Sequence, residues 1–148
     1  MDFKGANSLS RSAVHLIHRV GQRATDIFQD EARRSGLTPR QFAVLMSIAE
    51  EEGLTQTDLV ERTGIDRSTL ADLVARLLAR GMVQRRRAKS DARAYNVRLT
   101  AYGWRVLREA QPVAVAADTR LLDALPPAKR EEFLDTLDMI VTGSGKAD

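Results

Sequence analysis

Residues 82–100 read MVQRRRAKSDARAYNVRLT and contain the pattern that decides the fold. Polar and apolar residues alternate on both sides of the polar segment AKSDARA, and the apolar positions are Val83, Tyr95, Val97 and Leu99. Alternation of this kind around a short polar connection predicts a β-hairpin. The hairpin is strongly basic, because residues 85–98 contain six cations and a single acid, Asp91. This imbalance indicates a polyanionic partner such as nucleic acid.

The segment before the hairpin predicts two helices joined by a tight turn. A capping pair, Thr55 and Asp58, opens the first helix, and Gly64 ends it. The second helix starts at a cap residue, Asp66, and has one apolar face formed by Leu70, Leu73, Val74, Leu77 and Leu78. Its other face carries small, hydrogen-bonding or cationic side chains, which suit a recognition helix in the DNA major groove. Taken alone, this helix also fits an ordinary helical bundle. The hairpin that follows it favours a winged helix-turn-helix.

One acid interrupts the basic hairpin. Asp91 would be repelled by a phosphate if it faced DNA unpaired, so we interpret it as an internal anchor. Its carboxylate is suited to bond the loop backbone or to hold a neighbouring arginine in one conformation. Arg93, two residues later, is the side chain that would be presented in this way. The other cations of the hairpin suit contacts with phosphates and with a narrow minor groove.

Composition limits the remaining possibilities. The chain has 148 residues, 43% of them hydrophobic, which is enough for one core and too few to require two domains. It has no cysteine, which excludes disulfides, thiol nucleophiles and cysteine metal sites. Residues 66–108 hold 11 Arg or Lys against 3 acids, a local charge of +8 in a chain of net charge +3. On charge alone, a solvated arginine-rich surface remains the alternative to nucleic-acid binding. The first residues match neither a signal peptide nor a membrane span, so we expect a cytoplasmic protein with no membrane partner.

Helical patterns flank the winged region on both sides. Apolar residues recur at helical spacing over about residues 8–34, and the capping sequence TPRQ opens another helix at Thr38. After Thr100 the chain is expected to be helical to Leu125, with a bend at Pro112. A last helix begins at the following prolines and has an apolar side formed by Phe133, Leu134, Leu137, Ile140 and Val141. These apolar faces exceed what a small winged domain covers, so we expect a homodimer. A monomer with folded-back terminal helices is the alternative.

The chain resembles the MarR family of bacterial winged-helix regulators. Four residues match the family's wing signature: Asp91, Arg93, Leu99 and Thr100. Pro39, Gln41 and Phe42 match the helix before the helix-turn-helix, and DRSTL matches the start of the recognition helix. The resemblance implies a mainly α fold with a small β-hairpin wing, in a single domain over residues 1–148. It also implies a winged helix-turn-helix over about residues 38–100, between dimerisation helices at about 8–34 and 112–142.

The resemblance also implies roles for individual residues. Recognition of DNA is expected from Arg67, Ser68, Thr69, Asp72 and Arg76 in the second helix of the helix-turn-helix. In the wing it is expected from Arg86, Lys89, Asp91 and Arg93, with Arg93 entering the minor groove. The implied partners are a second copy of the chain and double-stranded DNA with a pseudo-palindromic operator.

Members of this family typically bind a small effector in a crevice between the dimerisation helices and the DNA-binding lobe. The candidate crevice residues are His15 and Arg19 as polar partners and Phe42, Met46 and Trp104 as apolar walls. Each has a simpler explanation, since the three apolar side chains fit the core and Arg19 fits an ion pair at a dimer interface. The function expected is a repressor released by an aromatic carboxylate or its coenzyme A thioester. A constitutive architectural DNA-binding protein without a ligand is the alternative.

Enzyme motifs are absent from the sequence. It has no cysteine, no phosphate-binding glycine loop and no nucleophile elbow. His15 and His18 lie three residues apart on a predicted helix, but no further ligands of matching spacing accompany them. We therefore expect no catalytic activity, no metal and no cofactor. Stoichiometric zinc in the purified protein would revive the enzyme hypothesis.

Overall fold

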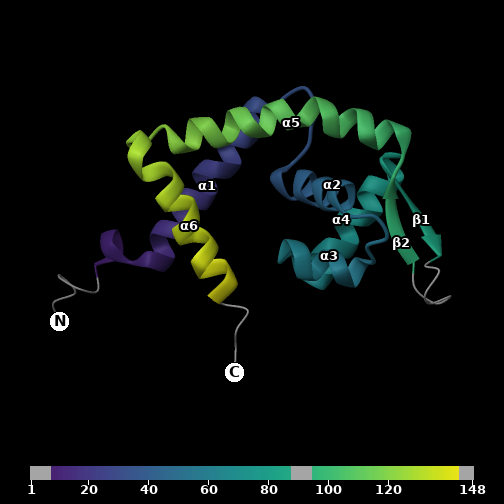
Figure 1. The fold of residues 1–148 in the computed structure, drawn as a ribbon, viewed down its shortest axis with the longest axis horizontal. Coiled ribbons are helices and arrows are strands. Elements are labelled where there is room, and N and C mark those ends of the chain that lie inside the picture. Colours follow the sequence, from purple (N-terminus) through teal and green to yellow (C-terminus); the bar gives the residue numbers. More distant parts are fainter. Residues whose placement is uncertain (1–7, 88–94, 144–148) are drawn as a thin grey trace.

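The computed structural model describes residues 8–87 and 95–143 and is mainly helical (Figure 1). A lobe formed by the helices of residues 39–79 and the β-hairpin lies on one side, and the first and last helices lie on the other. The long helix of residues 101–122 spans both sides. The elements, in chain order, are η1 (Leu9–Arg11), α1 (Ala13–Glu31), α2 (Pro39–Glu50), α3 (Gln56–Thr63), α4 (Arg67–Ala79), β1 (Val83–Arg87), β2 (Tyr95–Leu99), α5 (Ala101–Leu122) and α6 (Pro127–Gly143).

The helix starts predicted in the lobe are confirmed. Thr38 and Gln41 form a capping box: each backbone N–H donates to the other's side chain, at 3.1 and 3.2 Å. Thr55 and Asp58 form the same arrangement at the start of α3. Gly64 ends α3 with φ of +71°, a left-handed conformation that favours glycine. The helix-turn-helix therefore follows from short-range signals in the sequence.

The predicted hairpin is also confirmed, and it has an additional attachment. β1 and β2 pair antiparallel from Val83 opposite Leu99 to Arg87 opposite Tyr95. Thr55 forms a β-bridge with Asn96, and the Val97 N–H donates to the Leu54 carbonyl at 2.9 Å. β2 is thus bonded to the segment that precedes α3 as well as to β1. This bridge holds the hairpin against the helix-turn-helix.

The lobe has a closed apolar core. Its largest fully buried side chains come from every helix of the lobe, and they include Leu45, Leu59, Leu70, Leu77 and Met82. α5 is joined to this core at its first turn, where the Thr100 hydroxyl donates to the Gly81 carbonyl at 2.6 Å and accepts the Gly103 N–H at 3.0 Å. A Cβ added at Gly103 would overlap the Met82 carbonyl oxygen. The start of α5 therefore lies directly against the turn between α4 and β1.

The terminal helices differ from the expected boundaries. The predicted helix at about residues 8–34 is a short 3₁₀ turn followed by α1, because extended Ser12 interrupts it and caps α1 by accepting the His15 N–H at 3.3 Å. α5 continues through Pro112 as one helix, as the sequence predicted, and ends at Leu122, slightly before the expected end at Leu125. The chain leaves the helix only after Leu122 and starts α6 at Pro127.

α1 is attached to α5 through a second, smaller core. Ile27 and Phe28 of α1, and Ala32 at the cap of this helix, pack with Ala117 of α5. Phe28 also meets Phe42 of α2, with ring centroids 5.8 Å apart. The rest of α1 and all of α6 leave apolar side chains exposed. These exposed side chains include Val14, Leu16, Ile17, Val20, Leu134, Leu137 and Ile140.

Candidate DNA-binding surface and effector sites

The recognition helix α4 is fixed at its start by Asp66. The Thr69 N–H and the Thr69 hydroxyl donate to the two carboxylate oxygens at 2.8 and 2.7 Å. These two bonds, the backbone one first, hold the pKa of Asp66 below its ordinary value, and the positive charge of Arg40 acts in the same direction. Asp66 thus stays ionised as a helix cap, and α4 begins at a defined residue.

Four of the five predicted recognition residues lie on the outer face of α4. Arg67, Ser68, Asp72 and Arg76 are exposed. Asp72 and Arg76 pair along the helix with an oxygen-to-nitrogen distance of 3.1 Å. Thr69 is half-buried, and its hydroxyl donates to Asp66. In this structure Thr69 therefore takes part in the cap of the helix.

The strand β1, which follows α4 in the chain, is basic. Arg85, Arg86 and Arg87 are exposed, and the Arg87 guanidinium lies 6.0 Å from the centre of the Tyr95 ring. β1 follows α4 after a short turn at Gly81, so only a few residues of the chain separate these arginines from α4. Three predicted wing residues, Lys89, Asp91 and Arg93, lie outside the described residues.

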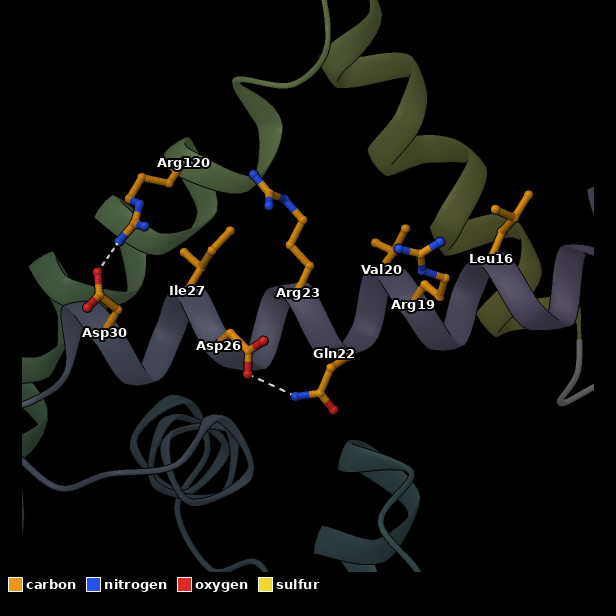
Figure 2. Close-up of a pocket in the computed structure, with 9 residues that line it drawn as sticks. All are labelled: Leu16, Arg19, Val20, Gln22, Arg23, Asp26, Ile27, Asp30 and Arg120. Atoms are coloured by element: carbon orange, nitrogen blue, oxygen red, sulfur yellow. Dashed lines mark hydrogen bonds and ion pairs between the residues drawn. The ribbon is translucent and has the colours of Figure 1, made fainter. Parts of the chain in front are cut away.

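A cavity of about 790 Å³ runs along α1 where this helix passes α5. Figure 2 shows Leu16, Val20, Arg23 and Ile27 extending from α1 on the side that faces α5 and α6. Arg19 also lines the cavity. Its lining also includes Arg120 and two carboxylates, Asp26 and Asp30, of which Asp30 is bonded to Arg120. Exposed Leu16 and Val20, beside the guanidinium groups of Arg19 and Arg23, suit a ligand with an apolar body and a negative charge.

The five predicted effector residues do not share one cavity. Arg19 lines the cavity along α1, whereas half-buried His15 belongs to the first turn of that helix. Phe42 and Met46 are half-buried and pack against the lobe core, and the Gln111 amide lies 3.6 Å from the Met46 sulfur. Trp104 on α5 is 42% exposed, so it is not a core residue in this chain. Arg23 lines the same cavity as Arg19, and the sequence analysis did not select it.

A second cavity, of about 450 Å³, lies between α1, α2 and α4. Thr25 and Gln29 border it from α1, and Arg40 borders it from the first turn of α2. Two of the predicted recognition residues, Asp72 and Arg76, line its third side. Arg40 was not predicted from the sequence, because its proximity to α4 depends on how α2 packs in the folded chain.

Comparison with known proteins identifies the family. The MarR family model matches residues 35–94. The transcriptional regulator HosA of Escherichia coli O127:H6 is 34% identical over 127 residues, which cover 86% of this chain and 93% of HosA. The chain belongs to the MarR family. The resemblance on which the sequence analysis relied is therefore confirmed, as is the winged-helix fold with its small hairpin.

Two further relatives of this MarR-family protein define its function class. The HTH-type transcriptional repressor NicR of Pseudomonas putida is 30% identical over 133 residues, covering 90% of this chain and 84% of NicR. A structure of Bordetella bronchiseptica BpsR, from work on regulation of its DNA binding by 6-hydroxynicotinic acid, matches with a TM-score of 0.87. It is 30% identical and covers 97% of this chain and 100% of BpsR. The protein is a DNA-binding transcriptional regulator. Within the described parts of the chain, every helix is too short or too polar to span a bilayer.

Proposed function

We propose that this protein is a homodimeric repressor that a small aromatic anion releases from a pseudo-palindromic operator. The observation that carries the proposal is the exposed polar face of α4, together with three exposed arginines on β1, the strand that follows it. An α-helix of this kind fits the major groove, while cations beside it neutralise phosphates. The relative NicR is named as a repressor, which supports repression, as opposed to activation, by this protein.

The dimer is supported by the exposed apolar stripes of α1 and α6. Ile17 of α1 is 49% exposed, and Leu134 and Ile140 of α6 are 43% and 55% exposed. Apolar stripes on two helices of one side favour burial against a second copy. Two copies would place two α4 helices on one DNA site, which accounts for a pseudo-palindromic operator.

The effector is supported by the cavity along α1. Arg19 and Arg23 place two cations beside Leu16 and Val20, so an aromatic carboxylate or its coenzyme A thioester would find both charge and apolar surface. BpsR, the structural relative, is regulated in its DNA binding by 6-hydroxynicotinic acid, which is an aromatic carboxylate. A ligand bound between α1 and α5 would change how α5 meets the turn between α4 and β1.

Binding to an operator selected from random DNA by the wild-type protein tests the DNA part of the proposal. Arg67→Ala should lose about 1–3 kcal/mol on the operator and less on unrelated DNA, because base-edge contacts discriminate between sequences. Arg108→Ala, which removes an equal charge from α5, serves as the control. Equal losses on both DNAs would make Arg67 a phosphate contact.

The ligand part is tested by titrating the wild-type complex with 6-hydroxynicotinate and other aromatic carboxylates. Release from the operator, and its weakening in Arg19→Ala and Arg23→Ala, is the expected result. If no aromatic carboxylate or thioester releases the wild-type protein, the architectural alternative without a ligand is favoured.

A further inference from the structure

The cavity between α1, α2 and α4 opens beside the face of α4 that is assigned to DNA. Asp72 and Arg76 belong both to that face and to the wall of the cavity. Arg40, on α2, borders the cavity from outside the helix-turn-helix formed by α3 and α4. A group bound in this cavity would therefore touch the recognition helix and its supporting helix at once.

Arg40 is an exposed cation that no acid neutralises directly. Among the described residues, no carboxylate lies within ion-pair distance of its guanidinium, whereas Arg76 is paired with Asp72 at 3.1 Å. Asp66 is near enough to feel the charge of Arg40 but is already held by two bonds from Thr69. The guanidinium of Arg40 thus keeps its donors available for an anion from outside the protein.

The dimensions of DNA indicate which part of the duplex would lie beside Arg40. The major groove is about 12 Å wide and an α-helix with its side chains is about 10–12 Å across, so a helix in the groove fills it from wall to wall. The walls are the two phosphate backbones. A cation on an element packed beside the recognition helix therefore lies next to a backbone and not next to base edges.

We propose that Arg40 contacts a phosphate of the DNA backbone that borders the groove occupied by α4. The phosphate sits at the cavity between α1, α2 and α4, where Gln29 adds a side-chain amide from α1. Arg40 fixes the position of the protein on the duplex and carries no sequence information itself. This inference rests on the proposed use of α4 in the major groove.

Salt dependence of DNA binding tests the contact. Each neutralised phosphate contributes about 0.9 to the slope of log affinity against log salt, so Arg40→Ala should lower that slope by about 0.9. The same relation gives an affinity loss of about eight-fold at 0.1 M salt that falls to about two-fold at 0.5 M. The loss should be equal on operator and on unrelated DNA. Arg40→Lys should retain most of the slope, and Arg108→Ala should leave it nearly unchanged.

Three outcomes would overturn the proposal. A lower melting temperature with an unchanged salt slope would show that Arg40 acts only through Asp66 on the start of α4. A loss confined to the operator would make it a base contact. Intact DNA binding in Arg40→Ala, together with loss of release by an aromatic carboxylate, would make the cavity an effector site. If neither Arg40→Ala nor Arg67→Ala weakens DNA binding, the proposed use of α4 in the major groove is refuted. If Arg67→Ala weakens DNA binding and Arg40→Ala does not, only the inference about Arg40 is refuted.

Discussion

The helices of the DNA-binding lobe and the terminal helix α6 all carry apolar side chains at helical spacing, but only those of the lobe are buried. In the lobe, Leu59 of α3 and Leu70 of α4 are fully buried against each other's helices. In α6 no residue is buried, and Ile140 is 55% exposed. An apolar stripe on a helix therefore predicts that the stripe is buried, but it does not predict which surface it is buried against. Within the lobe, the covering surfaces belong to the same chain.

Ion pairs do not account for the difference, since both regions have them. Arg62 of α3 bonds Glu50 and Glu51 at the end of α2, at 2.8 and 2.7 Å. Arg130 of α6 pairs with Asp123, the residue that follows α5, at a nitrogen-to-oxygen distance of 3.5 Å. Exposed ion pairs of this kind contribute little to the free energy of unfolding. The burial of apolar side chains therefore decides which region is stable without a second chain.

The largest effect is expected when the stripe of α6 is made polar. Replacing Leu137 and Ile140 with glutamate should abolish the dimer while the lobe keeps its fold, because only the uncovered stripe is altered. Loss of the second recognition helix should weaken operator binding by about 100-fold or more. Sedimentation and operator titration measure the two effects. Met139→Glu, on the opposite side of α6, is the matched control, and a persistent dimer in the double variant would refute the interface.

Gly103→Ala should have the largest effect on the lobe. The added Cβ would overlap the Met82 carbonyl oxygen, which is backbone and cannot rotate away. We expect a loss of about 1–3 kcal/mol in the free energy of unfolding, measured by urea denaturation. Gly21→Ala in α1 is the control. Its Cβ meets nothing within 4 Å, so that change should be neutral or stabilising. Equal behaviour of the two variants would contradict the packing of α5 on the lobe.

The sequence predicted the parts of the lobe that depend on neighbours in the chain. The capping boxes at Thr38 and Thr55 involve residues three apart, so their donors and acceptors are visible in the sequence. The Asp66 cap and the two strands of the hairpin follow from equally short patterns.

The features that the sequence did not predict depend on packing between distant segments. The bridge from Thr55 to Asn96 joins residues about forty positions apart, and the importance of Gly103 depends on Met82. The site was predicted unevenly for the same reason. The exposed face of α4 follows from helical periodicity, whereas the lining of the cavities depends on how α1 crosses the other helices.

A smaller, pH-dependent effect is expected from the cap of α4. The pKa of Asp66 in the folded protein lies below the ordinary value of 3.8, so its contribution to stability is complete above about pH 5 and is lost as the pH falls through the folded-state value. Asp66→Ala should therefore lower the melting temperature at neutral pH, and this difference from wild type should shrink in acid. A difference that stays constant from pH 7 to pH 3 would show that the carboxylate charge is not involved.

The smallest effect concerns Asp91 and Arg93, which lie outside the described residues, so the prediction rests on the sequence. If Asp91 positions Arg93, then Asp91→Ala should weaken DNA binding by about 0.5–1.5 kcal/mol, because Arg93 must then be ordered on binding. Net charge alone predicts the opposite sign, since removing an acid strengthens attraction to phosphates. Arg93→Ala should also weaken binding, and in that background the change at Asp91 should add little. Titrations of wild type, both single variants and the double variant at one salt concentration separate the two explanations. Tighter binding by Asp91→Ala would mean that the acid does not position Arg93.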